Sequence, residues 1–228
     1  MSVKLAGMLT VGAAVMLAVM LFARKRYYSV VAIWKVFLTD IVILLFGVCG
    51  AKLLCYVELG HFQGTSYYGA VFIVPPALLF LAAIVRTKPS DLLDLAAPAG
   101  CVMLATLKIL CFLSRCCYGI VLWIMQDGTA IRFPSQIVEF CNALLLMVVL
   151  LRLMRRDTMH GRIYPMYLLL YGITRFCLNL LRETTPFLLG LPAGNFWSLI
   201  AIFIGGVWLW FTRRPKGDKN EEHKEAAS

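Results

Sequence analysis

Long apolar stretches, separated by short polar ones, run along almost the whole chain. Seven of these stretches come close to the ~20 residues that an α-helix needs to cross a hydrocarbon core about 30 Å thick. They cover residues 5–23, 34–57, 67–85, 91–114, 134–151, 164–182 and 195–211. The pattern therefore predicts an all-α polytopic membrane protein with seven transmembrane helices.

The apolar stretches belong to one predicted unit, a seven-helix transmembrane domain over residues 1–211. Residues 212–228 are polar and charged and lack apolar periodicity, so we expect a disordered tail there. The sequence shows no repeat of fixed period and no separate soluble domain.

Basic residues alternate between the two predicted faces of the membrane. Most of them fall on the same side, in the connections after the first, third and fifth helices and in the tail: Arg24, Lys25, Arg26, Lys35, Arg86, Lys88, Arg152, Arg155, Arg156, Arg162, Arg213, Arg214, Lys216, Lys219 and Lys224. Because cytoplasmic loops are enriched in lysine and arginine, the amino terminus is predicted outside and the carboxyl tail in the cytoplasm. This asymmetry explains most of the net charge of +10. We therefore expect contact with anionic membrane lipids and not with nucleic acid, which needs a basic soluble surface.

Three cations, Lys52, Lys108 and Arg175, lie inside the apolar stretches. A charge near the bilayer centre costs ~2.5–3.5 kcal/mol on insertion scales, so such residues usually face the bundle interior or a water-filled cavity. Lys108 could instead extend its ammonium group to the membrane interface, as lysines near helix ends often do. Its position about seven residues inside the predicted boundary favours an anion-facing role.

Two of these cations begin polar stripes, each with its members on one helix face. The stripes are Lys108, Cys111 and Arg115, and Arg175, Asn179 and Arg182. Both lead from the membrane interior towards its outer side. They predict one anion pocket, shared by Lys108 and Arg175, that receives the headgroup of an anionic lipid.

Two acids also lie within predicted helices. Asp94, one turn into its helix, is expected to form an ion pair with a cation of another helix rather than to act in catalysis. Glu139 lies one turn beyond Pro134, a residue suited to the first turn of a helix. We expect Glu139 to pair with Arg175 or Lys108, or to act on a proton.

Neither a metal nor a cofactor is predicted. The eight cysteines form no CxxC or CxxH pair. They are expected to be packing thiols, the alternative being a disulfide from Cys111 to Cys116 or Cys117. All three histidines fall outside the predicted helices. Candidates for a general base are therefore Tyr68, Glu139, Asp94 or the substrate itself.

The outer segment from Gly60 to Gly69 contains three glycines and little aliphatic packing. A two-tailed phospholipid has to keep its acyl chains in hydrocarbon, so it needs a lateral opening to reach an internal cation. We expect this segment to be the mobile gate. By composition alone, an aromatic belt at the membrane interface explains its tyrosines better than contact between a lipid headgroup and its backbone amides does.

Five segments between residues 45 and 211 occur in an order known from one family. They are Gly50-Ala-Lys-Leu-Leu-Cys-Tyr56, Ser66-Tyr-Tyr-Gly-Ala70, Asp94 through Lys108 to Tyr118-Gly119, Pro134-Ser-Gln-Ile-Val-Glu139, and Tyr171-Gly-Ile-Thr-Arg175 through Arg182. In this order they resemble the prolipoprotein diacylglyceryl transferases of bacteria. The resemblance implies a multi-pass protein of the bacterial cytoplasmic (inner) membrane.

The resemblance also implies an activity, which is transfer of a diacylglyceryl group from phosphatidylglycerol to the cysteine thiol in the signal peptide of a lipoprotein precursor, with release of glycerol phosphate. It assigns catalytic roles to Lys108, Arg175, Glu139 and Tyr68. The residues expected to bind substrate are Lys52, Tyr56, Gly69, Asp94, Gly119, Gln136 and Arg182.

Several positions depart from the family pattern. Lys52 and Lys108 replace arginine, Cys111 replaces asparagine, Cys116 and Asn179 replace glutamate, Tyr68 replaces histidine, and Ala70 replaces glycine. Lysine keeps the charge but lacks the bidentate geometry with which arginine holds a phosphate. The departures leave open a related phospholipid-dependent transferase with a different acceptor, or a catalytically inactive lipid-binding relative. A small transporter is the least favoured alternative, since the sequence shows no broken helices or inverted repeats.

Overall fold

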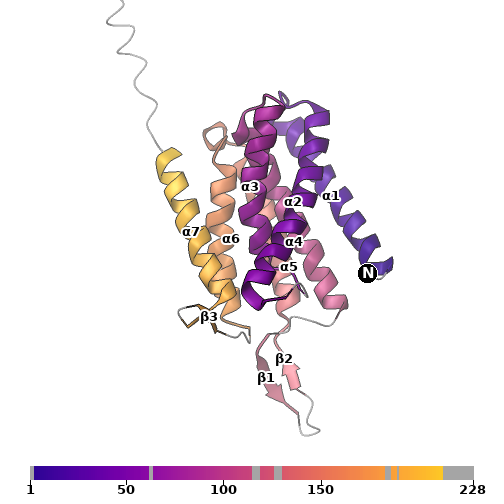
Figure 1. The fold of residues 1–228 in the computed structure, drawn as a ribbon, viewed down its shortest axis with the longest axis vertical. Helices are drawn as coiled ribbons and strands as arrows, with labels where there is room; N and C mark the ends of the chain where they lie inside the picture. The colour runs from indigo at the N-terminus through magenta and orange to yellow at the C-terminus, as the bar shows by residue number, and fades with distance from the viewer. Residues whose placement is uncertain are drawn as a thin grey trace, which may run out of the picture.

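The computed structural model describes residues 3–61, 64–114, 119–125, 130–182, 186–188 and 190–212. Within these ranges, seven α-helices form an upright bundle with two small antiparallel hairpins at one end (Figure 1). The helices are α1 (Val3–Tyr27), α2 (Ile33–Leu59), α3 (Tyr67–Ile84), α4 (Pro89–Leu113), α5 (Ser135–Leu153), α6 (Ile163–Asn179) and α7 (Ala193–Thr212), with a short 3-10 helix η1 (Asp157–Met159). The hairpins pair β1 (Val121–Ile124) with β2 (Ala130–Arg132), and β3 (Pro186–Leu188) with β4 (Leu191–Pro192).

The prediction of an all-α membrane protein is confirmed at the level of fold class. Six of the described helices, all except α6, are long and apolar enough to cross a membrane. The exception, α6, has 17 residues. The predicted tail over residues 212–228 lies outside the described residues beyond Thr212.

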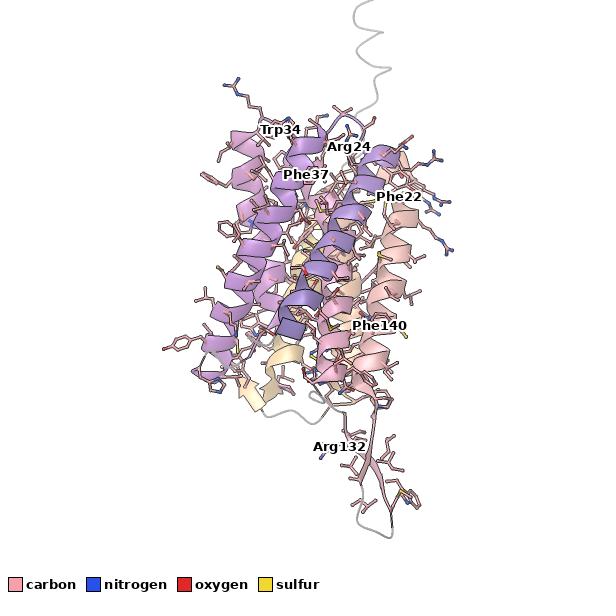
Figure 2. All side chains as sticks on the ribbon, turned by 90° about the vertical axis from the view of Figure 1, so that its right-hand side faces the viewer. Phe22, Arg24, Trp34, Phe37, Arg132 and Phe140 are labelled. Carbon is pink, nitrogen blue, oxygen red and sulfur yellow. The ribbon has the colours of Figure 1, made fainter. Side chains whose placement is uncertain are left out.

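The outer faces of the bundle are rich in apolar side chains. Figure 2 labels three of them, Phe22, Trp34 and Phe37, and all three are exposed. Phe80, Phe203 and Trp210 are more exposed still among the described large apolar side chains. Large apolar patches on a helical surface are typical of a protein that contacts lipid or another protein.

The prediction that Asp94 forms an ion pair with a cation of another helix is wrong. In the described part of the chain, no cation contacts the Asp94 carboxylate. Its Oδ2 accepts hydrogen bonds from the Tyr28 hydroxyl (2.7 Å) and the Gly161 amide (2.6 Å). Its Oδ1 accepts from the amides of Ile163 (3.0 Å) and Tyr164 (3.2 Å). The first backbone amides of a helix have no acceptor within that helix. The Asp94 carboxylate, on α4, accepts from the amides at the start of α6 and so acts as a cap from another helix. Burial and the neighbouring Asp94 carboxylate raise the pKa of Tyr28, so its hydroxyl stays a donor.

Two glycines bring the backbones of α2 and α3 into direct contact. A Cβ atom on Gly69 would lie 2.0 Å from the carbonyl oxygen of Gly50, and one on Gly50 would lie 2.4 Å from the carbonyl oxygen of Gly69. Just before α3, the Ser66 amide donates to the carbonyl of Ala51 (3.0 Å). The start of α3 is therefore fixed against the second half of α2.

The hairpins were not predicted. In the first of them, Trp123 pairs with Ile131, and both side chains are exposed. The hairpin is attached at its base, where Gly119 N donates to Phe133 O (3.0 Å) and Ile120 N donates to Leu181 O (3.1 Å). It thus joins the connection between α4 and α5 to the end of α6.

Candidate functional site

Three cations converge on the carboxylate of Glu139, in the second turn of α5. The Lys108 ammonium group lies 2.6 Å from Oε2, and the Arg175 guanidinium contacts the same oxygen. Arg182 Nη1 lies 3.4 Å from Oε1. We call these four residues the ionic centre. It joins α4, α5, α6 and the segment that follows α6.

The ionic centre is largely shielded from solvent. The side chain of Glu139 is 4% exposed, and those of Lys108, Arg175 and Arg182 are 11%, 15% and 16% exposed. The sequence predicted one cation on Glu139, either Lys108 or Arg175, whereas the structure brings both of them and Arg182 to it. Buried charges are tolerated when they are paired, and breaking a buried pair typically costs about 3–5 kcal/mol.

The charges of the ionic centre do not balance among the described residues, because three cations share one carboxylate. In addition, the buried Arg182 Nε has no hydrogen-bond partner in the described part of the chain. A buried donor without a partner costs about 1–3 kcal/mol. An anion such as a phosphate would balance the charge and could accept from this nitrogen.

Tyr68 is buried in the first turn of α3 and bonds to α7. Its hydroxyl lies 2.7 Å from Ser198 Oγ, and Ser198 in turn donates to the carbonyl oxygen of Gly194 (2.6 Å). Because the single hydroxyl proton of Ser198 is used towards Gly194, Tyr68 is the donor in their shared bond. The Tyr68 ring also packs against Tyr171, with ring centroids 5.3 Å apart, one turn before Arg175.

Asn179, the middle member of the second predicted stripe, also bonds to α7. It is buried, and its Nδ2 donates to Asn195 Oδ1 (2.7 Å). Gly194 packs so closely here that a Cβ atom on it would lie 2.8 Å from Asn179 Nδ2. These contacts, together with the Tyr68–Ser198 bond, hold α7 beside α3 and α6 near the ionic centre.

A cavity of about 400 Å³ is lined by residues of α1, α2, α3, α4 and α6. Its wall is mostly apolar and includes the Tyr67 and Tyr167 rings, whose hydroxyls lie 2.9 Å apart. Lys52, Thr65 and Ser114 are among its few polar residues. Thr65 belongs to the predicted gate segment.

The sequence predicts that Lys108 and Arg175 share one pocket. The structure brings their charged groups together on Glu139, but neither residue lines the 400 Å³ cavity. The cavity and the ionic centre are therefore two distinct features of the same bundle.

The other predicted substrate-binding residues lie at different places. Lys52 lines the cavity, Gln136 is buried at the start of α5, and Tyr56 is exposed on α2. Gly69 lies in the α2–α3 contact. A Cβ atom on Gly119 would lie 2.8 Å from Leu181 O, so this glycine packs at the base of the hairpin.

Glu58, in the last turn of α2, is an acid that the sequence analysis missed. Ser66 Oγ donates to its Oε1 (2.8 Å). Arg175 and the Trp197 indole also act on this carboxylate. In the sequence Glu58 looks like an ordinary interfacial acid. The one available signal was a hydroxyl residue a short turn away, at the start of the next helix.

The described residues contain no group of three histidine, cysteine or acidic side chains that could hold a metal ion. Five of the described cysteines are free thiols, namely Cys49, Cys55, Cys101, Cys141 and Cys177. The alternative disulfide to Cys116 or Cys117 lies outside the described residues.

Comparison with known proteins identifies one family. The family model described as prolipoprotein diacylglyceryl transferase matches residues 2–211. A relative from Paracidovorax citrulli, named phosphatidylglycerol--prolipoprotein diacylglyceryl transferase, is 29% identical over 168 residues, which cover 67% of this chain and 62% of the relative. A relative of the same name from Methylibium petroleiphilum is 30% identical over 167 residues, 66% of this chain and 63% of the relative.

A third relative matches over a longer range. It is the phosphatidylglycerol--prolipoprotein diacylglyceryl transferase 2 of Clostridium perfringens, 25% identical over 241 residues, which cover 94% of this chain and 93% of the relative. The Paracidovorax and Methylibium matches, in contrast, span less than two thirds of those relatives' own length.

Proposed function

Because the chain belongs to the prolipoprotein diacylglyceryl transferase family, we propose that it transfers a diacylglyceryl group from phosphatidylglycerol to the thiol of a lipobox cysteine in a lipoprotein precursor, releasing glycerol phosphate. The convergence of three largely shielded cations on the buried Glu139 carries this proposal. Such a centre is suited to a phosphodiester, whose departing phosphate gains negative charge as its bond to the glyceryl carbon breaks.

In the proposed reaction the thiolate sulfur attacks the glyceryl carbon that carries the phosphate. A carbon–sulfur bond forms, the carbon–oxygen bond breaks, and its electron pair leaves with glycerol phosphate. Lys108 and Arg175 stabilise the charge on the phosphate, while Glu139 holds both cations in place. Donors preorganised for a developing negative charge typically contribute ~10²–10³ in rate each.

We further propose that the seven-helix domain spans the bacterial cytoplasmic membrane seven times, with the amino terminus outside. The ends of α2 and α4 and the starts of α3 and α5 then lie on the outer side, together with the hairpins (Figure 1). This places the ionic centre towards the membrane face where a translocated precursor presents its cysteine.

The cavity supports a lipid donor. Most of its wall is apolar, as the acyl chains of phosphatidylglycerol require, and Lys52 and Thr65 provide polar groups near its outer end. In this proposal phosphatidylglycerol enters sideways from the bilayer near the Gly60–Gly69 segment, and its phosphate reaches the ionic centre.

The proposal is tested by incubating the purified chain with phosphatidylglycerol and a lipobox peptide, followed by mass spectrometry. The expected result is a peptide carrying one diacylglyceryl group, with an equal amount of glycerol phosphate. A peptide with serine in place of the cysteine is the matched control and should stay unmodified. Release of glycerol phosphate without peptide modification would indicate a different acceptor, and no reaction at all would contradict a transferase function.

A further inference from the structure

Glu58 connects the end of α2 to the start of α3 and faces Arg175 of the ionic centre. Its carboxylate accepts a hydrogen bond from Ser66, and the Ser66 backbone is fixed in turn by the Ala51 carbonyl. The charged or polar groups that face Glu58 from the packed elements are Arg175 on α6 and the Trp197 indole on α7. On its own helix Glu58 faces Cys55, one turn back.

The other candidate bases near the ionic centre are already engaged. Both carboxylate oxygens of Glu139 contact cations, which stabilise its ionised form and make it a weak proton acceptor. The Tyr68 hydroxyl donates to Ser198. Asp94 lies at the opposite end of α4 and accepts four hydrogen bonds.

Glu58 differs from Glu139 in its surroundings. The hydrogen bond from Ser66 uses Oε1 and orients the carboxylate, but a neutral hydroxyl does not hold a negative charge as three cations do. The Trp197 indole also faces this carboxylate, and among the described cations of the ionic centre only Arg175 acts on it. A half-buried carboxylate that is oriented by a neutral hydroxyl and faces one cation is a suitable acceptor for a substrate proton.

We propose that Glu58 is the catalytic base of this chain and takes the proton from the acceptor thiol. This inference rests on the proposed function. As the proton moves from sulfur to a Glu58 oxygen, sulfur forms its bond to the glyceryl carbon and the phosphate oxygen leaves with the electron pair of the broken bond. Glu58 then returns the proton to the released glycerol phosphate or to water. The balance is complete without a further reactant.

The test compares wild-type protein with Glu58→Gln. Glutamine has the same shape and can still accept from Ser66, but it cannot take a proton at neutral pH. General-base catalysis typically contributes 10²–10⁴-fold, so we expect turnover at pH 7 to fall by ~10²-fold or more with little change in the KM for phosphatidylglycerol. The matched control is Asp157→Asn, which neutralises an exposed acid in η1 at the other end of the molecule and should react as wild type.

Two further measurements separate a base from a residue that only shapes the site. An unperturbed thiol ionises near pH 8.5, so the rate of Glu58→Gln should rise about tenfold per pH unit between pH 6 and 8, much more steeply than that of wild type. A peptide with selenocysteine in place of the lipobox cysteine is ionised without help at neutral pH. It should therefore restore most of the lost rate to Glu58→Gln.

The outcomes are distinct. A wild-type chain that forms no product contradicts the proposed function itself. An active wild type together with a fully active Glu58→Gln contradicts only the role of Glu58. A loss in Glu58→Gln that is the same at every pH and with the selenocysteine peptide also overturns it, because that pattern indicates a structural role. Thermal melting in detergent, expected to match wild type, shows that the variant is folded.

Discussion

Lys108 supplies the ionic centre with a compact positive charge, whereas Arg175 and Arg182 supply planar guanidinium groups. A guanidinium can hold two oxygens of one phosphate, and an ammonium group acts as a point charge. In the proposed reaction, position 108 therefore needs a positive charge, and position 175 needs both the charge and the planar geometry of a guanidinium.

The first prediction concerns these two cations. Lys108→Ala and Arg175→Ala should each lower the rate of diacylglyceryl transfer by ~10²-fold or more, because each removes one donor to the departing phosphate. Lys108→Arg, the matched charge-preserving variant, should keep or raise the rate. Rates are measured by mass spectrometry at equal amounts of folded protein. Normal activity in both alanine variants would rule out the ionic centre as the catalytic site.

The second prediction concerns Tyr68. An unperturbed phenol titrates near 10, so it is a poor base at neutral pH, and here its hydroxyl donates to Ser198. Tyr68→Phe should therefore leave readily measurable transfer and remove only the bond to α7. The comparison is with Arg175→Ala in the same assay. An equally deep loss in both variants would show that the Tyr68 hydroxyl takes part in the chemistry.

Individual residues of the candidate site could be recognised in the sequence where a charged side chain interrupts an apolar stretch. Lys108, Arg175 and Glu139 stand out because charges are rare in apolar stretches. Asp94 gave the same signal, but three of its four partners are backbone amides, which every residue except proline carries and which no sequence pattern reveals. Glu58 lies where an apolar helix ends, and acids are ordinary there.

Between elements, the decisive contact is the one between α2 and α3. Gly50 and Gly69 let the two backbones touch, and this contact fixes the start of α3 with Ser66 and Tyr68. The same crossing brings Glu58 to Ser66. The placement of Glu58, the proposed base, therefore depends on the glycines at positions 50 and 69.

The third prediction follows from this contact. Gly50→Ala should lower the melting temperature in detergent and reduce transfer, because its new methyl group would lie 2.4 Å from the Gly69 carbonyl oxygen, which is rigid backbone. Gly47→Ala, one turn earlier on α2, is the matched control, since its methyl group would lie 3.7 Å from the nearest atom. Gly47→Ala should melt at or above the wild-type temperature. Equal melting of the two variants would contradict the close α2–α3 contact.

Helices and hairpins differed in how well the sequence predicted them. A run of about twenty apolar residues strongly favours a membrane-spanning helix, and the predicted helices lie close to the observed ones. The strands β1 and β2 have four and three residues, too short for a period-two pattern to emerge. The contacts among Lys108, Glu139 and Arg175 join three helices, and no periodicity within one helix determines how it packs on another.

For the whole molecule, charge differs between the two ends of the bundle. Figure 2 shows Arg24 at the end where α1 meets α2, and Arg132 on the hairpin at the opposite end. At the Arg24 end, Lys35 Nζ donates to Val85 O (2.9 Å) and Thr87 Oγ1 (2.6 Å). Basic side chains thus hold together the connections at the end where most basic residues lie.

The last prediction tests the orientation and the number of spans together. A protease site inserted between Met125 and Ala130 should be cut in intact spheroplasts, and one inserted after Thr212 should be cut only in inverted vesicles. The number of spans depends on whether α6 crosses the membrane. Its 17 residues extend about 26 Å, slightly less than a hydrocarbon core of about 30 Å. It nevertheless runs beside α7 for its whole length (Figure 1), and its buried tyrosines pack inside the bundle.

If α6 crosses the membrane, the end of α7 lies in the cytoplasm and the site after Thr212 is protected in spheroplasts. If α6 did not cross, α7 would run in the opposite sense and the same site would be cut from outside. An inserted site in η1, at the connection between α5 and α6, is the matched control and should be cut only from the cytoplasmic side. A cytoplasmic hairpin site would contradict the orientation and, with it, the placing of the ionic centre where a translocated cysteine can reach it.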